Sequence, residues 1–397
     1  MNPQLWRILA TAFFMMAPFA VQAEQEAPPQ GFTPHVATEI DMGLYSSTTT
    51  RATDPMRRGT SLFLFGDIGA AFHVTPNFSI QTVFMPEPVG RGDATGGFPN
   101  GGVMGFRHQA LVLETFTAEW KPDDALRLYV GHFLAPFGRG HEDFPGIFTK
   151  VRAHEIELIE NNVGIGGTWT VLADPRFGEH DLSAALFSID RSYGSSTWIT
   201  SHRCCNPRYE RYDRTTAAQG GPGNNGQVNS FAIALDGDKF DFLPDFSYHL
   251  ATVSRAAGTD GTAREWGYVA ALRYEIPWTQ RWRTLFFGEA VRFTNFEGRP
   301  YDASGSIVSA RRDFSTLGAQ NRLGEWRSTL AWQQDQIKSR PESLPTENFY
   351  EVSIGRDLGA GFGLDIGYQY GRQTIEDTGK LGSTHAVLAR LGWRGGH

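Results

Sequence analysis

The feature that most constrains this chain is a regular succession of strand-like segments whose connections alternate between short and long. The short connections are rich in Pro, Gly, Asn and Asp, as in Thr75–Pro76–Asn77 and Asp236–Gly237–Asp238, because tight turns need fixed or positive φ angles or side-chain capping. The longer ones all follow odd-numbered segments and lie near 47–60, 87–107, 134–161, 190–226, 254–264, 295–309, 335–346 and 372–383. This rhythm is typical of transmembrane β-barrels, in which one rim carries tight turns and the other carries long loops.

Apolar and polar residues alternate within the segments. In 361–371, one face carries Phe362, Leu364, Ile366, Tyr368 and Tyr370. A period of two places such a set on one side of a pleated strand. An open sheet edge in hydrocarbon would leave backbone groups unpaired, so the sheet must close. We therefore predict an all-β, closed antiparallel transmembrane β-barrel over 34–393. We expect about sixteen strands, with fourteen or eighteen as the alternatives. The count of fourteen would apply if 310–321, which is weakly apolar throughout, is not a strand.

The first residues are typical of a secretory signal. Residues 1–23 contain Arg7, then an apolar run, and end in Val21–Gln22–Ala23, which fits a small-x-small cleavage site. The run is too short for a spanning helix. We expect cleavage near Ala23, a flexible segment at 24–33, a C-terminal overhang at 394–397, and a location in the lipids of a Gram-negative outer membrane.

Composition and motifs exclude several function classes. The formal net charge of −7 argues against a nucleic-acid surface, which needs clustered Lys and Arg. The chain contains no Gly-x-Ser-x-Gly, His-Glu-x-x-His or phosphate-loop pattern, so we expect no enzyme and no cofactor. Two alternatives stay open: an outer-membrane barrel enzyme with scattered catalytic residues, and a non-conducting scaffold or secretion barrel.

The third long connection holds the residues that we expect to control passage through the barrel. Pro136 has no N–H to donate, so strand pairing should end there. Phe137, Phe144, Ile147 and Phe148 are too apolar for a solvated loop tip, and we expect the segment to fold inward. A constriction bearing charges of both signs would set solute selectivity, and the candidate contacts are Arg127, Arg139, Glu142, Asp143, Lys150 and Arg152. The alternative is a surface loop whose aromatic residues pack on one another.

A short motif at the start of this connection carries a family resemblance. Gly131, Phe133, Pro136, Phe137 and Gly138 resemble the Gly-x-Phe and Pro-Phe-Gly signature of outer-membrane porins of the phosphate-selective O/P type. The resemblance implies a third loop that narrows the pore, passive diffusion of small hydrophilic solutes or ions with a preference for anions, and a homotrimer. Glu142 and Asp143 interrupt the run of bases that a family-like anion site would need.

Two further groups of residues complete the predictions. Alternation places eight charged residues on the inner face, where they either contact solute or pair with one another: Arg127, Arg273, Arg327, Arg390, Asp67, Glu275, Glu351 and Asp365. Cys204 and Cys205 are adjacent in the longest connection, where a vicinal disulfide or free thiols are favoured. With His202 they offer too few ligands at poor spacing for a metal, so we expect no metal site.

Overall fold

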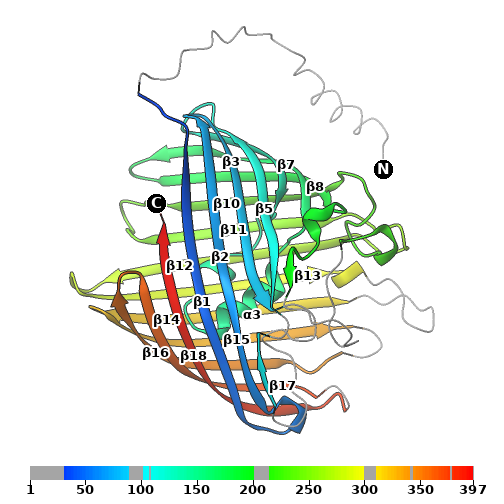
Figure 1. The fold of residues 1–397 in the computed structure, drawn as a ribbon, viewed down its shortest axis with the longest axis vertical. Helices are drawn as coiled ribbons and strands as arrows, with labels where there is room; N and C mark the ends of the chain where they lie inside the picture. The colour runs from blue at the N-terminus through cyan, green and yellow to red at the C-terminus, as the bar shows by residue number, and fades with distance from the viewer. Residues whose placement is uncertain are drawn as a thin grey trace.

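The computed structural model describes residues 31–88, 102–106, 109–200, 214–298, 310–339, 343–375 and 378–396. These residues form one barrel-shaped sheet (Figure 1). The first half of the wall consists of β1 (His35–Ala52), β2 (Gly59–Thr75), β3 (Phe78–Pro88), β5 (Gln109–Trp120), β6 (Leu126–Phe133), β7 (Asn162–Asp174), β8 (Gly178–Ile189) and β10 (Ser230–Asp238). The second half consists of β11 (Phe246–Arg255), β12 (Glu265–Pro277), β13 (Trp282–Thr294), β14 (Arg311–Leu323), β15 (Trp326–Lys338), β16 (Glu347–Gly359), β17 (Phe362–Thr374) and β18 (Leu381–Gly396).

The barrel is closed by its first and last strands. Each strand of the wall pairs antiparallel with the next, and β1 pairs with β18, where Met42 lies opposite Trp393. Two short strands, β4 (Val103–Gly105) and β9 (Ile199–Thr200), pair beside β2 and β5 and do not extend the ring. Among the described residues, sixteen strands therefore form the wall, as predicted.

The alternation of short and long connections is confirmed, with differences at some strand ends. The tightest turns include Pro76–Asn77 and Gly324–Glu325, and the third long connection runs over 134–161. Asp236–Gly237–Asp238, predicted as a turn, belongs to β10, and the connection lies at 239–245. Residues 394–396, predicted as an overhang, continue β18, because their backbone pairs with β1 as far as Glu39–Gly396.

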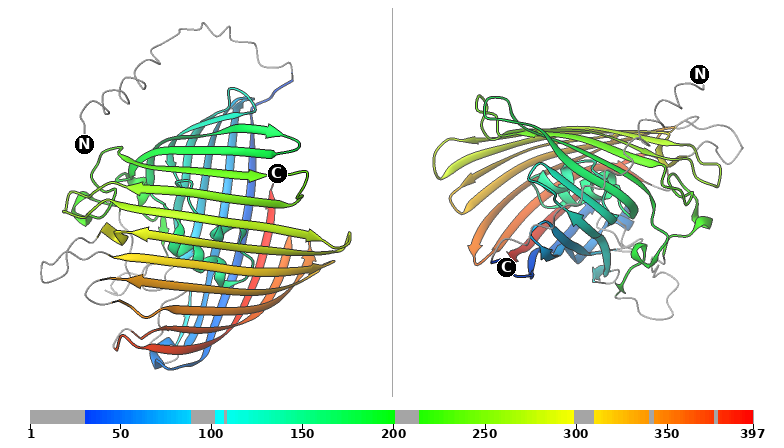
Figure 2. Two further views of the ribbon diagram at one scale, coloured as in Figure 1. Left: turned by 180° about the vertical axis from the view of Figure 1, so that it is seen from behind. Right: turned by 90° about the horizontal axis from the view of Figure 1, so that it is seen from above.

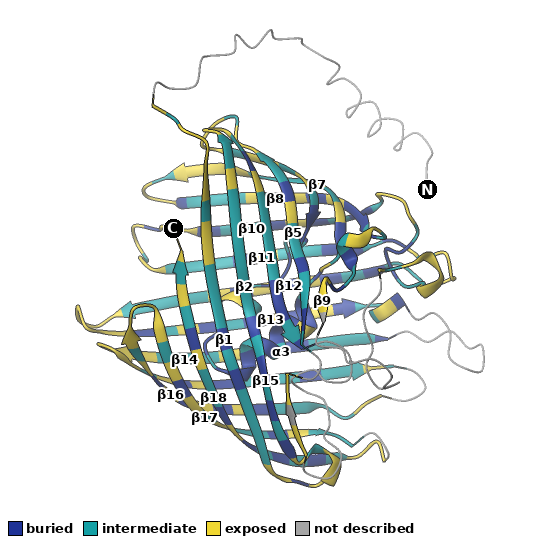
Figure 3. Cartoon of the chain, in the orientation of Figure 1, coloured by how far each residue is buried: buried dark blue, intermediate teal, exposed yellow. Residues whose placement is uncertain are grey.

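The inner and outer faces follow the predicted alternation. In β17, the Ile366 side chain is 53% exposed on the outer face, whereas Asp365 is 7% exposed on the inner face. Figure 3 shows buried and exposed residues alternating along the strands. The weakly apolar segment 310–321 nevertheless forms a regular strand, β14, which pairs with both neighbours.

One irregularity of the sequence pattern has a packing explanation. Apolar residues occupy both faces of β13 at Phe286 and Phe287, yet the strand pairs on both sides without a register shift. Phe286 is exposed outward, while Phe287 is buried against Phe144 inside the barrel, with ring centroids 5.5 Å apart. The second apolar face therefore exists because a loop packs against it.

Some predictions cannot be compared with this fold. The signal at 1–23, most of the segment at 24–33, and Cys204 and Cys205 lie outside the described residues. Among the residues described, no helix has the length and apolarity needed to span a membrane.

Candidate functional site: the inward loop and its cavities

The connection between β6 and β7 folds into the interior of the barrel, as its apolar composition predicts. It contains two helices, α2 (Gly140–Asp143) and α3 (Phe148–Glu157), which Figure 2 shows enclosed by the strands when seen from above. Phe137 packs on Phe293 of β13, with ring centroids 5.4 Å apart. Phe148 packs on Tyr45 and Phe63 of β1 and β2. Together with Phe144 on Phe287, these contacts fix the loop against separate parts of the wall.

Two carboxylates of the wall bind the backbone of the inward loop. Glu351 of β16 accepts hydrogen bonds from the N–H groups of Ile147, Phe148 and Thr149, at 2.5, 3.0 and 3.1 Å. Those N–H groups open α3 and have no partner within the helix, so a buried carboxylate satisfies them and complements the helix dipole. Glu289 of β13 accepts in the same way from Arg139 and Gly140, at 2.7 and 3.1 Å.

The five motif residues build the entrance to this loop. Gly131 has a φ of +142°, and a Cβ there would lie 2.2 Å from the carbonyl oxygen of Phe116 on β5. Gly138 also has a positive φ, +76°. Between them, Phe133 and Phe137 are buried in the same apolar cluster, and pairing of β6 ends before Pro136. The motif thus bends the chain inward and anchors it there.

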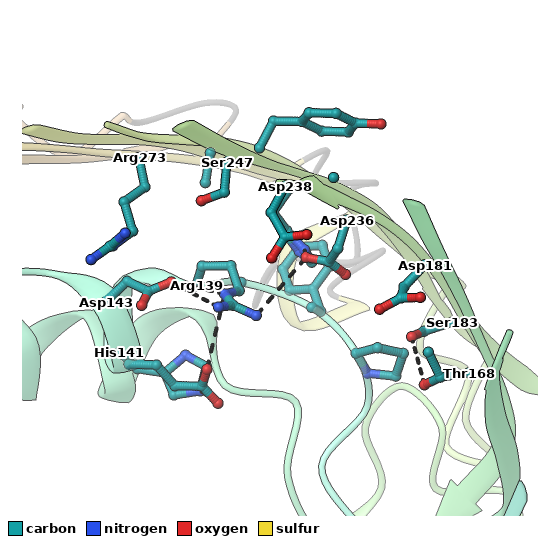
Figure 4. Close-up of a pocket in the computed structure, with 18 of the residues that line it drawn as sticks. Arg139, His141, Asp143, Thr168, Asp181, Ser183, Asp236, Asp238, Ser247 and Arg273 are labelled. Atoms are coloured by element: carbon teal, nitrogen blue, oxygen red, sulfur yellow. Dashed lines mark hydrogen bonds and ion pairs between the residues drawn. The ribbon is translucent and has the colours of Figure 1, made fainter. Parts of the chain in front are cut away.

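The loop leaves a cavity of about 570 Å³ on one side (Figure 4). We call it the main cavity. Its walls are the loop and the inner faces of β6 to β8 and β10 to β13. Its charged lining residues are Arg127, Arg139, Arg273, Glu142, Asp143, Glu179, Asp181, Asp236 and Asp238. The main cavity is therefore lined by twice as many carboxylates as guanidinium groups.

Four of those carboxylates form a compact wall on β8 and β10. Asp181 lies directly opposite Asp236 in the strand register, and Glu179 lies opposite Asp238. Like charges placed directly opposite each other destabilise a sheet. Asp236 accepts a hydrogen bond from Nδ1 of His249 at 2.8 Å, and Asp181 accepts one from the Thr170 hydroxyl at 2.6 Å. Both strand ends adjoin short connections, so this acidic wall lies toward that rim of the barrel.

Arg139 is one of the predicted bases that line the main cavity, and its guanidinium group lies close to three carboxylates. Its Nη2 lies 2.9 Å from Asp143, its Nε lies 3.9 Å from Glu142, and its Nη1 lies 3.9 Å from Asp236. Burial alone would lower the pKa of Arg139, but these carboxylates outweigh burial and raise it. Arg139 is therefore charged, and much of its charge is balanced locally.

The structure brings some of the predicted contact residues together and separates others. Arg127, Arg139, Glu142 and Asp143 line the main cavity. Lys150 instead lines a smaller cavity of about 100 Å³, the minor cavity, with Asp41, Asp67, Glu114, Glu142 and Arg390. Arg152 stacks on the ring of Phe349, 3.4 Å from its centroid, and lines neither cavity.

Several predicted inner-face charges pair with one another. Arg327 binds Asp365 through Nε and Nη2, at 2.7 and 2.9 Å. Arg390 lies 3.9 Å from Asp365, and Arg273 lies 3.1 Å from Glu275. For these residues, the reading that inner-face charges brace the wall fits the structure.

Burial also sets the charge state of titratable groups on the loop. Burial raises the pKa of Glu157 to about 7 and lowers the pKa of His154 to about 3. Glu157 accepts hydrogen bonds from the N–H and Nδ1 of His141, at 2.6 and 3.0 Å.

Sequence reasoning missed the acidic wall. Glu179, Asp181 and Ser183 alternate along β8, which is a readable signal of one shared face. Asp236 and Asp238 were hidden by their composition, because Asp-Gly-Asp also fits a turn. Glu179 and Asp181 lie opposite Asp238 and Asp236 because of the β8–β10 register. The sequence of the connection between these two strands does not reveal that register.

Comparison with known proteins supports the architecture. No family model and no curated protein matches the chain. Among solved structures, the chain is similar to the outer membrane channel DcaP of Acinetobacter baumannii, with a TM-score of 0.52 and 10% identity over 91% of this chain and 97% of that one. It is also similar to the trimer form of OmpT, an outer membrane protein of Vibrio cholerae, with a TM-score of 0.50 and 8% identity over 91% and 100%. The chain therefore shares the closed antiparallel β-barrel fold of these outer membrane proteins.

Proposed function

We propose that this protein is an outer-membrane porin through which small hydrophilic solutes or ions diffuse passively. The observation that carries the proposal is the main cavity: an open, charged space inside a closed barrel, bounded on one side by an anchored loop. Charged rings at a narrow point are how channel linings discriminate between ions. The secretory signal predicted at 1–23 and the outward apolar face fit an outer-membrane location.

The lining of the main cavity supports a different ion preference from the one that the sequence resemblance implies. The sequence resemblance implies a preference for anions, with Arg127, Arg139, Lys150 and Arg152 as contacts. In the main cavity, carboxylates outnumber guanidinium groups, and Arg139 is balanced by its neighbours. Because charges interact more strongly in a narrow, partly dehydrated passage than in bulk water, we propose that the acidic wall favours cations.

Single-channel recording in a planar bilayer tests both parts of this proposal. Open current steps support a porin, whereas a barrel that inserts without conducting supports a scaffold. Reversal potentials in a salt gradient then measure selectivity. Asp181→Asn with Asp236→Asn is expected to reduce the preference for cations, and Glu325→Gln, in an exposed turn, serves as the control for loss of a carboxylate outside the cavity. An unchanged reversal potential in the double variant would place the acidic wall outside the permeation path.

A second pair of variants tests the predicted bases. Arg139→Glu lies in the main cavity and is expected to shift selectivity further toward cations. Lys150→Glu lies in the minor cavity and is expected to have a smaller effect. Equal effects of the two would show that both cavities conduct.

We also propose that the chain assembles as a homotrimer in the membrane. The resemblance to the O/P-type porins implies this assembly, and the similar OmpT structure is described as a trimer form. Chemical cross-linking of the purified protein in detergent is expected to give a trimer band, and monomers at every cross-linker concentration would contradict it.

A further inference from the structure

Three potential metal ligands meet where α3 faces the wall at β3, away from the main cavity. Glu87 belongs to β3, and His154 and Glu155 belong to α3. One side-chain ligand atom from each residue lies within 4.8 Å of the other two. Carboxylate oxygens and an imidazole nitrogen at such separations are close enough to share one ion after small side-chain adjustments.

His154 supplies an independent indication that something binds here. Its side chain is only 6% exposed, yet neither ring nitrogen has a hydrogen-bond partner among the described residues. A buried polar group without a partner is costly and uncommon. Phe65 packs edge-on against the His154 ring, with centroids 5.1 Å apart, so the ring is held with a nitrogen near the two carboxylates.

The charges around the cluster also favour a cation. The carboxylates of Glu114, Glu155 and Glu160 all interact electrostatically with Glu87. Lys150 is a neighbouring base, since its charge acts on Glu114 and on His154. A divalent ion bound between Glu87 and Glu155 would relieve the repulsion between their carboxylates.

We propose that Glu87, His154 and Glu155 bind a divalent transition-metal ion, with Zn²⁺ as the representative case. Imidazole together with carboxylate is a donor set suited to such ions, and water fills the positions that three protein ligands leave open. Because one ligand comes from the wall and two come from the loop, the ion would tie α3 to β3.

Zn²⁺ titration of the folded barrel tests the proposal. The chain is purified without a polyhistidine tag, refolded in detergent, stripped with EDTA and titrated calorimetrically. All variants carry His35→Ala, because the His35 and His73 rings stack 4.8 Å apart and two adjacent imidazoles can compete for Zn²⁺. His154→Gln and Glu87→Gln are each expected to weaken Zn²⁺ binding by at least about tenfold, since even changes outside the ligand set typically cost that much.

The control is Glu325→Gln, which removes an exposed carboxylate in the β14–β15 turn and should leave Zn²⁺ affinity unchanged. Folding of each variant is verified by its altered gel mobility before and after heating. A second readout is the visible absorption of Co²⁺ bound in place of Zn²⁺, which should disappear in His154→Gln. Wild-type-like Zn²⁺ affinity in both ligand variants, or no binding by the parent chain, would overturn the proposal.

Discussion

At the scale of single residues, the sequence indicated which charges face inward but not what they bind. Alternation placed Glu351 on the inner face, and the structure confirms this. Its three backbone donors lie more than 200 residues earlier in the chain. No local pattern reveals such a contact, because it depends on where the loop comes to rest. The same reason explains why Arg139 and Lys150, close in sequence, line different cavities.

Glu351→Gln is expected to loosen the inward loop. The amide keeps one acceptor oxygen but turns an N–H₂ group toward backbone donors, and a hydrogen bond to a charged group contributes about 1.5–3 kcal/mol. Trypsin digestion of the refolded barrel measures this, through cleavage after Lys150 or Arg152. The wild type should resist cleavage and the variant should not, while Glu325→Gln should behave like the wild type. Equal resistance would show that apolar packing alone holds the loop.

Asp190 gives an expected pH dependence. It lies just after β8 and accepts hydrogen bonds from Nδ1 of His132 at 2.8 Å and from Ser192 at 2.7 and 2.9 Å. Burial alone would raise the pKa of Asp190, but these hydrogen bonds outweigh burial and lower it below 3.8. A lowered pKa stabilises the fold above the unfolded-state value, and this contribution is lost as the pH falls through the folded-state value. The melting-temperature difference between wild type and Asp190→Asn should therefore shrink below about pH 4. A difference independent of pH would contradict this assignment.

At the scale of elements, strands were easier to predict than the loop's internal structure. Period-two alternation and turn residues located every strand of the wall, because both signals are local. Strand ends were less certain. β10 includes the predicted turn Asp236–Gly237–Asp238 and β18 includes residues 394–396, because pairing with a neighbour can extend a strand past its apolar pattern. The inward course of 134–161 followed from its aromatic residues, but the short helices α2 and α3 depend on Glu289 and Glu351 in the distant wall.

Removing the helical part of the loop tests what this element does. Replacing residues 140–157 with a short Gly-Ser linker should leave the wall intact and raise single-channel conductance severalfold, because the segment fills the middle of the barrel. Heat-dependent gel mobility verifies the fold, and conductance at fixed salt gives the result. A deletion variant that keeps the wild-type conductance would show that another segment limits the current.

At the scale of the whole molecule, the ring depends on the pairing of its two ends. β18 pairs with β1 from Thr384 to Gly396, so residues 394–396 form the end of this ladder, and Arg394 also forms an ion pair with Asp41. Deleting residues 394–397 is therefore expected to lower the temperature at which the barrel unfolds on a gel. Arg394→Ala alone should have a smaller effect, because that side chain is largely exposed and exposed ion pairs contribute little. An unchanged unfolding temperature on truncation would mean that closure does not need these residues.

The acidic wall lies toward one rim of the barrel, at the start of β8 and the end of β10. Fixed charge concentrated at one mouth of a pore enriches counter-ions differently when the applied voltage is reversed. The current–voltage curve should then be asymmetric even with identical salt on both sides. Because the loop is anchored to the wall at several points, this rectification would be instantaneous and would require no moving gate.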